Sequence, residues 1–492
     1  MTAASQPSYE LFIGGKGTSG TSGAQRTLLN PATNRPLAST ALADAEDARH
    51  AMEVAQTAFD KSGWAGDDGS KRAKALFRLA SKLEEQADAF AELESLNQGK
   101  TLREAKGDIG FVVRTLEYMA GLADKLQGET IPVPGPRLDY TLREPMGVTV
   151  HIAPWNFPLV LAMRSVAPAL GAGNAVVLKP ATLTPLTALR VAQLSTAAGV
   201  PDGIFNVVVG DGAKVGEALI TDPRCRAVSF TGSREVGQRV AELAGKRRVP
   251  ITLELGGKGP VLVYPDADLD RAAKAIGWGI FGNAGQMCWA GSRLLVHASV
   301  HDEVLSKVRS IAEKLKVGPG GDAGVEMGPL VSAEQRSRVL QFIEEARATG
   351  TKVAAGGTPY ASGPLSEGYF VPPTVLDAPP PDARVVREEV FGPVLSVQSF
   401  TSMDESIRLA NDTEYGLLAS IWTKDLATAH SVARQLETGM VTVNDPPSTY
   451  PQSPFAGYKD SGLGFEQGMQ AVEFFTRRKN VLLNLAVPKP RA

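Results

Sequence analysis

The sequence from Gly147 to Gly257 alternates short apolar runs with amphipathic helical segments. The runs GVTVHIAP, NAVVLKP, IFNVVVG, AVSFTG and ITLELGG have the length of buried strands, and apolar residues recur at helical spacing between them. This alternation predicts an α/β fold, with a parallel sheet covered by helices on both faces. Such sheets bind ligands beyond the carboxyl ends of their strands, so functional residues are expected at that edge.

The same alternation starts again after Gly256. It predicts a second α/β domain over 257–458, beside a first domain that comprises 1–122 and 146–256. About three amphipathic helices are expected between 44 and 125, with no residues of chemical interest. Prolines interrupt 123–145, and the β-rich FFTRRKNVLLNL lies in 459–492. These last two segments are expected to protrude and to bridge domains or subunits.

Length and composition exclude several classes of protein. A chain of 492 residues exceeds one hydrophobic core, and 43% hydrophobic with 21% charged residues is typical of a soluble globular protein. The net charge of −2 gives no reason to expect nucleic acid or an anionic membrane as partner. Two cysteines make no disulfide framework, and five scattered histidines show no zinc spacing. Without a signal peptide or a spanning run, a metal-free cytoplasmic protein is expected.

Glycine spacing alone misleads in the search for a phosphate site. The spacings at 277–282 and 318–323 resemble G-x-G-x-x-G, but neither follows a strand, so both are interpreted as chance matches. A better candidate is Thr231-Gly232-Ser233, which follows the strand AVSF and opens a helix. Backbone amides at a helix N-terminus bind anions. The alternative is a plain helix cap.

Four further residues carry candidate chemistry at strand ends. Lys179 could bind the hydroxyls of a nucleotide ribose, and Thr182 stands where a carboxylate would repel a 2′-phosphate, so NADP is allowed beside NAD. Glu254 ends a buried strand, where desolvation would raise its pKa toward that of a general base. The Asn156 amide could donate to an oxyanion. Each has a structural alternative, and their convergence on one sheet edge favours the functional interpretation.

Cys288 lies in GNAGQMCWAGS, a glycine-rich stretch where backbone amides can approach a ligand closely. The alternatives are a small buried hydrophobe and a covalent nucleophile. A nucleophilic thiol needs a lowered pKa. The motifs PWNFP, VVLKPA, FTGS, LELGGK, GQMC, EEVFGPV and PFAGYKDSGLG occur in this order along the chain. Over essentially its whole length the sequence resembles the aldehyde dehydrogenase superfamily.

The resemblance implies a Rossmann-type cofactor domain, a catalytic domain and a small β oligomerisation extension. It implies that Cys288 attacks the aldehyde, that Asn156 and the Cys288 amide hold the oxyanion, and that Glu254 activates water to hydrolyse the thioester, as in the non-acylating members. The catalytic set is Cys288, Glu254, Asn156 and Lys179. The cofactor set is Trp155, Lys179, Thr182, Thr231, Gly232, Ser233, Leu255, Glu389 and Phe391.

The positions that line the substrate tunnel in the family carry Phe157, Val160, Leu161, Arg164, Met287, Trp289 and Phe455 here. Arg164 either binds a substrate carboxylate or is held by its own domain, and RSVAPALGAGNAVVLKPA resembles the aromatic-aldehyde enzymes. We expect an aromatic or bulky aldehyde, with a semialdehyde or a betaine or amino aldehyde as alternatives. A thiol esterase and a non-catalytic protein of the same fold are the other classes. A homodimer or homotetramer is expected.

Overall fold

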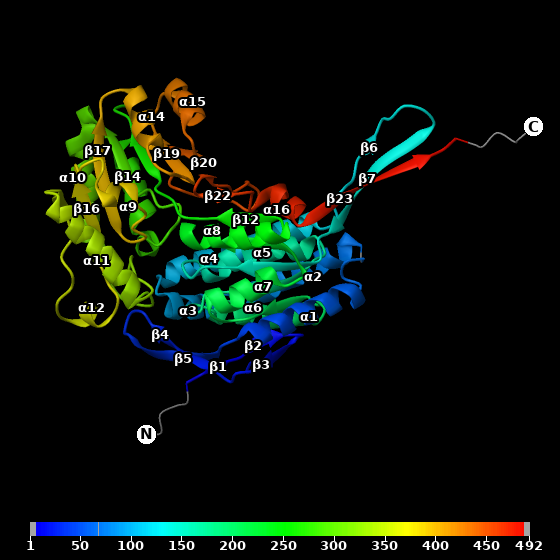
Figure 1. Ribbon diagram of the computed structural model, residues 1–492. Coiled ribbons are helices and arrows are strands. Elements are labelled where there is room, and N and C mark those ends of the chain that lie inside the picture. The colour runs from blue at the N-terminus through cyan, green and yellow to red at the C-terminus, as the bar shows by residue number, and fades with distance from the viewer. Residues whose placement is uncertain (1–5, 67, 487–492) are drawn as a thin grey trace, which may run out of the picture.

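The computed structural model describes residues 6–66 and 68–486 and is built on two large sheets that lie side by side (Figure 1). The first sheet has eight strands in the order β22-β12-β11-β8-β9-β10-β2-β3. Its five central strands are parallel, as predicted, and both edges carry antiparallel additions. The bounds are β2 Leu11–Ile13, β3 Lys16–Thr18, β8 Val148–Ile152, β9 Ala175–Lys179, β10 Phe205–Val207, β11 Cys225–Thr231, β12 Ile251–Glu254 and β22 Gly462–Leu463.

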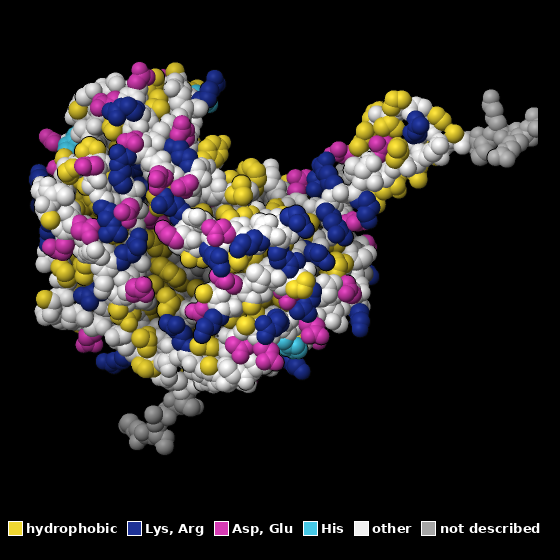
Figure 2. Space-filling model, viewed as in Figure 1, with side chains coloured by type: hydrophobic (Ala, Val, Ile, Leu, Met, Phe, Trp, Pro, Cys, Tyr) yellow, Lys and Arg dark blue, Asp and Glu magenta, His cyan; other side chains and the backbone are white. Residues whose placement is uncertain are grey.

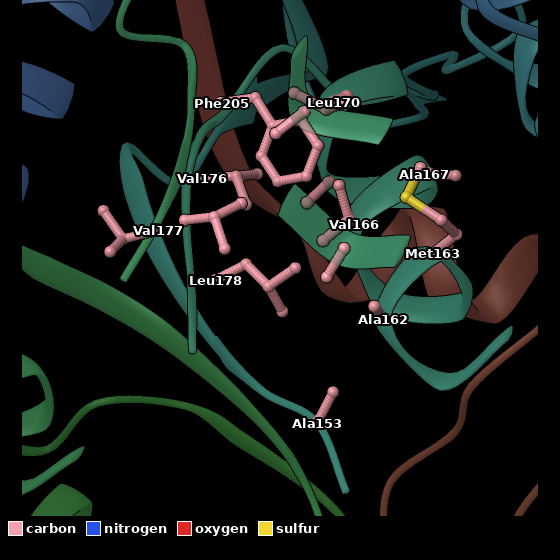
Figure 3. Close-up of a cluster of buried hydrophobic side chains, with 14 of the residues drawn as sticks. Ala153, Ala162, Met163, Val166, Ala167, Leu170, Val176, Val177, Leu178 and Phe205 are labelled. Atoms are coloured by element: carbon pink, nitrogen blue, oxygen red, sulfur yellow. The ribbon is translucent and has the colours of Figure 1, made fainter. Parts of the chain in front are cut away.

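Helices cover the first sheet, and its strands β9 and β10 are buried at every residue. Val166 and Leu170 point from their helix toward Phe205 and one side of β9, whereas Val177 points to the other side (Figure 3). Because Val177 is also fully buried, both faces of the strand are covered. The helices are α1 Ala45–Lys61, α2 Gly69–Glu85, α3 Ala87–Gln98, α4 Leu102–Leu122, α5 Pro158–Gly171, α6 Leu186–Ala197, α7 Glu217–Thr221 and α8 Arg234–Arg247.

The second sheet has seven strands in the order β15-β16-β17-β14-β13-β19-β20, all parallel except β15. The second alternation therefore also forms a parallel sheet. The strands are β13 Pro260–Val263, β14 Arg293–His297, β15 Lys352–Ala355, β16 Thr374–Asp377, β17 Val394–Phe400, β19 Leu418–Trp422 and β20 Met440–Val443. The helices are α9 Leu269–Phe281, α10 His301–Lys314, α11 Ala333–Ala348, α12 Pro364–Glu367, α13 Arg384–Arg387, α14 Met403–Asn411 and α15 Leu426–Gln435.

A long two-stranded ribbon leaves the body of the molecule as an arm (Figure 1). It pairs β7 (Arg137–Pro145) with β23 (Thr476–Asn484) along nine residues, and β6 (Thr130–Ile131) lies on the other side of β7. A small sheet near the N-terminus contains β1 (Ser8–Tyr9), β5 (Arg35–Ala41) and β4 (Gln25–Asn30). Two short strands, β18 (Tyr415–Gly416) and β21 (Tyr458–Lys459), pair with each other.

Two expectations about segments differ from the structure. The region 44–125 holds four helices rather than about three, because the chain breaks at Gln86 between α2 and α3, where no glycine or proline marks a boundary. The segment 459–492 is not only a bridging segment. Its strand β22 joins the first sheet beside β12, and α16 (Gly468–Phe474) packs against α5.

No helix among the described residues is long and apolar enough to cross a membrane.

Asn174 joins three segments at the amino end of the first sheet. Its amide donates to the carbonyls of Ala169 (3.0 Å) and Phe475 (2.9 Å), and its Oδ1 accepts the Gly147 N–H at 3.0 Å. The side chain is fully buried, so water cannot replace these bonds. Asn174 thereby ties the end of α5 to the start of β8 and to the residue before β23.

Replacement of Asn174 by alanine should therefore destabilise the fold. It leaves the Gly147 N–H and the Phe475 carbonyl without the side-chain partner, whereas the Ala169 carbonyl still accepts the Asn174 N–H at 3.0 Å. We expect a loss of about 3 kcal/mol, seen as a fall of several degrees in the thermal midpoint at fixed scan rate. Asn484→Ala is the matched control, since Asn484 is exposed near the end of the arm. Equal midpoints for the two variants would show that Asn174 does not hold these segments together.

Candidate active site

Cys288 lies in a tightly turned loop between α9 and β14. The preceding residues Asn283, Ala284 and Gly285 all have positive φ, at 47°, 52° and 72°. Such conformations cost energy for residues other than glycine, and they concentrate at functional sites. The Glu104 carboxylate of α4 accepts the Asn283 N–H at 2.7 Å and holds the turn. The loop is therefore fixed in place before any ligand binds.

The loop that follows β12 packs directly against the backbone of Cys288. A Cβ on Gly257 would lie 2.1 Å from the Cys288 carbonyl oxygen, and one on Gly285 would lie 2.1 Å from the Gly392 carbonyl oxygen. Both approaches are possible only without a side chain. The backbones of two loops, the one between β12 and β13 and the one before β17, thus set the position of the Cys288 loop.

Cys288 lines two cavities. The first, of about 440 Å³, is a mostly apolar tunnel. All seven residues expected at the tunnel lie on its wall, which is where the sequence places an aldehyde: Phe157, Val160, Leu161, Arg164, Met287, Trp289 and Phe455. The other wall residues are Arg103, Glu104, Gly107, Asp108, Phe111, Arg114, Trp278, Gly282, Asn283, Ser448, Thr449 and Gln467.

The second cavity is a cleft of about 650 Å³ between α8 and α11. Figure 2 shows this hollow, with apolar side chains in its depth and charged side chains at its rim. Of the expected cofactor residues it brings together Trp155, Thr231, Gly232, Ser233, Leu255, Glu389 and Phe391, with Asn156 and Cys288 at the same cleft. Lys179 and Thr182 are not among its lining residues.

Lys179 ends β9, and its ammonium group donates to the Pro180 carbonyl at 3.3 Å. Burial lowers the pKa of Lys179 to about 8, and Asp211 partly opposes this shift. Thr182 follows on the same connection and is half-buried. A ribose contact from either residue would extend the site beyond the cleft that the structure shows.

The N-terminus of α8 faces the cleft through Ser233, which caps the helix by accepting the Val236 N–H at 3.4 Å. The Gly232 N–H donates to the Glu254 carbonyl at 3.0 Å, so it is not available to a phosphate. The free amides of the first turn of α8 remain as donors.

Glu254 is 1% exposed, and neither of its carboxyl oxygens has a hydrogen-bond partner among the described residues. Burial raises its pKa well above the usual value; Arg164 opposes this and Glu466 adds to it. Burial of this kind favours the protonated form, and the ionised carboxyl is a stronger base than one in water. The sequence expectation of a raised pKa matches this environment.

Arg164 on α5 is held by its own protein. Its Nε donates to the Glu466 carboxylate, which also accepts the Ser229 hydroxyl at 2.8 Å, and its guanidinium lies 4.5 Å from the centre of the Phe455 ring. The pair is almost completely buried. The positive charge of Arg164 is therefore matched by Glu466, although its Nη2 has no hydrogen-bond partner among the described residues. The matched charge favours a positioning role over binding of a substrate carboxylate.

The thiol of Cys288 is not pre-activated by its surroundings. Burial raises the pKa of Cys288 to about 12; Arg164 lowers it, and Glu389 and Glu254 raise it. The expected lowered pKa is thus absent without a ligand. A cation bound in the cleft would lower it, because a nearby positive charge favours the thiolate.

Asn156 lies beside the thiol on the connection from β8 to α5. Its side-chain Nδ2 donates to the Gln286 backbone carbonyl at 3.0 Å, and the Asn156 backbone carbonyl accepts the Asn283 side-chain N–H at 2.9 Å. One Nδ2 hydrogen is left for an oxyanion. The bonds tie Asn156 to the Cys288 loop, so both donors of the expected oxyanion site move together.

Glu389 closes the cleft on the other side. Its Oε1 accepts the Gly257 N–H at 3.0 Å, and burial raises its pKa to about 7 while that hydrogen bond lowers it. Nearby, the rings of Trp155 and Phe391 meet edge to face with centroids 5.2 Å apart. A carboxylate and aromatic edges in one cleft suit the ribose and ring of a nucleotide cofactor.

Several wall residues of the tunnel were not expected. Helix α4 contributes Arg103, Asp108 and Phe111, although its sequence shows only an ordinary amphipathic pattern. Gln467 lies beside the recognised tail motif, but no spacing points to it. Among the described residues no group of three or more His, Cys, Asp or Glu could hold a metal.

The environment of Glu254 generates a stability prediction. Because its pKa is raised in the folded protein, folding is favoured by the bound proton, and this contribution is lost as the pH rises above the unfolded value of 4.5. Glu254→Gln should raise the thermal midpoint at pH 8 by a few degrees and change it little at pH 5. A gain that is the same at both pH values would contradict a protonated, unpartnered carboxyl.

The comparisons with known proteins agree with this geometry. The model of the aldehyde dehydrogenase family matches residues 18–481. Betaine aldehyde dehydrogenase of Bacillus subtilis (strain 168) is 42% identical over 97% of this chain and 98% of its own length. Phenylacetaldehyde dehydrogenase of Pseudomonas fluorescens is 41% identical over 96% of both. The NAD+ complex of an aldehyde dehydrogenase from Bacillus cereus superposes with a TM-score of 0.95 at 40% identity, covering 97% of each chain. The chain belongs to the aldehyde dehydrogenase family.

Proposed function

We propose that this aldehyde dehydrogenase oxidises an aromatic or otherwise bulky aldehyde to the carboxylic acid with NAD+, through a thioester on Cys288. The observation that carries the proposal is that one thiol lines both the apolar tunnel and the nucleotide-sized cleft. An aldehyde that enters the tunnel and a cofactor that enters the cleft meet at the same sulfur atom. Proximity of this kind is what a covalent oxidation requires.

Cys288 at the junction, Asn156 at the cleft and the buried Glu254, which lines neither cavity, have complementary roles in the reaction. The Cys288 sulfur attacks the carbonyl carbon, and the free Nδ2 hydrogen of Asn156 and the Cys288 N–H stabilise the oxyanion that forms. Bound NAD+ would supply a positive charge beside the thiol, which favours loss of the thiol proton to solvent, and would accept the hydride. Glu254, in its ionised form, then accepts a proton from the water that attacks the thioester; the C–S bond breaks, the acid leaves and the Cys288 thiolate is restored. A buried, unpartnered carboxyl fits this task, because its proton affinity is high.

Support for NAD+ comes from the cleft and from the solved relatives. The first turn of α8 offers amides for a pyrophosphate, and Glu389 and Phe391 lie where a ribose and a nicotinamide would end. The solved Bacillus cereus relative is an NAD+ complex. Since Thr182 carries no charge, a 2′-phosphate meets no repulsion there, and we propose that NADP+ is accepted with lower preference.

The tunnel favours a neutral, bulky aldehyde over the alternatives. Apolar atoms make up most of the exposed surface of its wall, and the charge of Arg164 is bound to Glu466. A semialdehyde would bring a second carboxylate to a guanidinium that is already paired. A betaine aldehyde would place a cation near Arg164. The named relatives include both betaine and phenylacetaldehyde enzymes, so the argument depends on the wall of the tunnel.

A thiol esterase is the second class that the site has to be weighed against. Cysteine hydrolases pair the thiol with a histidine, and no histidine lines either cavity. A thiol esterase also needs no nucleotide, so it would not explain the cleft.

With both cysteines of the described chain free, we propose a cytoplasmic location.

We also propose that the chain forms a homodimer or homotetramer through the arm and the edge strand β20. Apolar side chains are exposed along both: Leu138, Leu142, Leu482 and Leu483 on the arm and Val443 on β20. Apolar atoms gather at the notch between β20 and the arm in Figure 2. An open strand edge beside apolar surface is a site of strand pairing. We propose a separate partition on the basis of the two large sheets and the arm: a first domain of 1–122 with 146–256, a second domain of 257–458, and the bridging segments 123–145 and 459–492.

Cys288→Ala tests the catalytic proposal. We expect no reduction of NAD+ above background with any member of an aldehyde panel, while NAD+ binding measured by calorimetry changes less than threefold, because the residue meets the cofactor only at its reacting end. Cys225→Ala is the matched control, since Cys225 is buried away from both cavities. Substantial dehydrogenase activity in Cys288→Ala would overturn the covalent route. A wild type that oxidises acetaldehyde as well as benzaldehydes would overturn the substrate class.

Leu482→Asp tests the proposed assembly. A charge on the arm should oppose its burial, and light scattering after size exclusion should show a shift toward smaller species. Leu426→Asp is the control, because Leu426 is 71% exposed on α15, away from the arm. An unchanged mass for Leu482→Asp, or a monomeric wild type, would contradict an interface through the arm.

A further inference from the structure

Gln467 has a backbone conformation that is unfavourable for its residue type. Its φ and ψ are 66° and 174°, in a region that only glycine occupies without strain. The residue lies directly before α16, and the backbone bonds between Glu466 and Phe455, at 2.7 and 2.8 Å, hold it beside the tunnel wall. A strained glutamine where glycine would fit better points to a use for its side chain.

The side-chain amide of Gln467 is buried and only half satisfied. The Thr449 hydroxyl donates to its Oε1 at 2.6 Å, which fixes the amide orientation. Its Nε2 has no hydrogen-bond partner in the part of the chain that the structure describes, although the residue is 1% exposed. An unpaired buried donor is costly. Because Gln467 and Thr449 both line the aldehyde tunnel, a bound substrate is the partner that the site lacks.

The surroundings define what kind of group the amide would bind. Its neighbour Phe455 and most of the wall are apolar, so the body of the ligand is apolar too. The Glu466 carboxylate next in sequence and Arg164 are bound to each other and add little net charge, so an anion gains no net attraction here. A neutral oxygen that accepts one hydrogen bond is the group that fits.

We propose that Gln467 determines specificity by donating a hydrogen bond from Nε2 to a neutral acceptor oxygen, such as a methoxy, hydroxyl or carbonyl oxygen, on the part of the aldehyde that lies away from Cys288. This inference rests on the proposed function of the tunnel and deepens it. Thr449 is a positioning residue, since it holds the amide and does not itself meet the substrate.

The test compares pairs of benzaldehydes that differ by one atom. For each ring position, kcat/KM is measured for the methoxy compound and for its ethyl isostere, with benzaldehyde as reference. The wild type should prefer the methoxy compound at one ring position about three- to tenfold, the value of a neutral hydrogen bond to a donor that is otherwise unpaired.

Three variants separate the donor from general packing. Gln467→Leu should abolish the preference by lowering kcat/KM for the methoxy compound while leaving the ethyl compound within about twofold. Gln467→Gly should also abolish it, yet raise the thermal midpoint, because glycine relieves the strained backbone. Thr449→Val should reduce the preference partly. Ser453→Ala is the control, since Ser453 lies in the same loop but lines neither cavity, and it should keep the preference.

The outcomes distinguish this inference from the function on which it rests. Good turnover of benzaldehyde with equal rates for methoxy and ethyl compounds at every position overturns the role of Gln467 and leaves the proposed function intact. A preference that survives in Gln467→Leu does the same. A preference for hydroxyl but not for methoxy compounds would mean that the amide oxygen faces the tunnel, which overturns the donor assignment. No oxidation of any aromatic aldehyde overturns both proposals.

Discussion

Close contact between backbones at the Cys288 loop is the constraint on which the rest of the site depends. Gly257 meets the carbonyl of Cys288, and Gly285 meets the carbonyl of Gly392, at distances that exclude a side chain. These contacts hold the thiol where the tunnel and the cleft join. The two parallel sheets supply the loops, but the sulfur reaches the junction only because no Cβ intervenes. One fixed atom can then serve both cavities.

The active site contains two desolvated ionisable groups, whose burial lowers the stability of the fold and sets their reactivity. Glu254 is buried without a partner, and the partly buried Cys288 has a raised pKa, so desolvation favours the neutral form of both groups before a ligand binds. The nearby ion pair of Arg164 and Glu466 adds little net charge. A positive cofactor therefore changes the balance at the thiol more than any residue of the wall. The Cys288 thiol is therefore expected to ionise and react only when the cofactor occupies the cleft.

Much of this arrangement could be predicted from the sequence. Apolar alternation predicts both parallel sheets, and the residues at strand ends, with Asn156 and Glu254 among them, meet at one edge, because strand direction decides where they go. Contacts that depend on tertiary packing could not be predicted. The amphipathic pattern of α4 gives no sign that it lines the tunnel, and the bond from Gly232 to Glu254 depends on strand register. The strain at Gln467 is likewise invisible without its backbone angles.

The covalent route is tested most directly by trapping the intermediate. Glu254→Gln is mixed with NAD+ and benzaldehyde, quenched in acid and digested, and the peptide containing Cys288 is weighed by mass spectrometry. The predicted result is a gain of one benzoyl group on Cys288, with one NADH formed per site, because oxidation proceeds and hydrolysis lacks its base. NADH formed over many turnovers, with the Cys288 peptide unmodified throughout, would contradict a thioester that Glu254 hydrolyses.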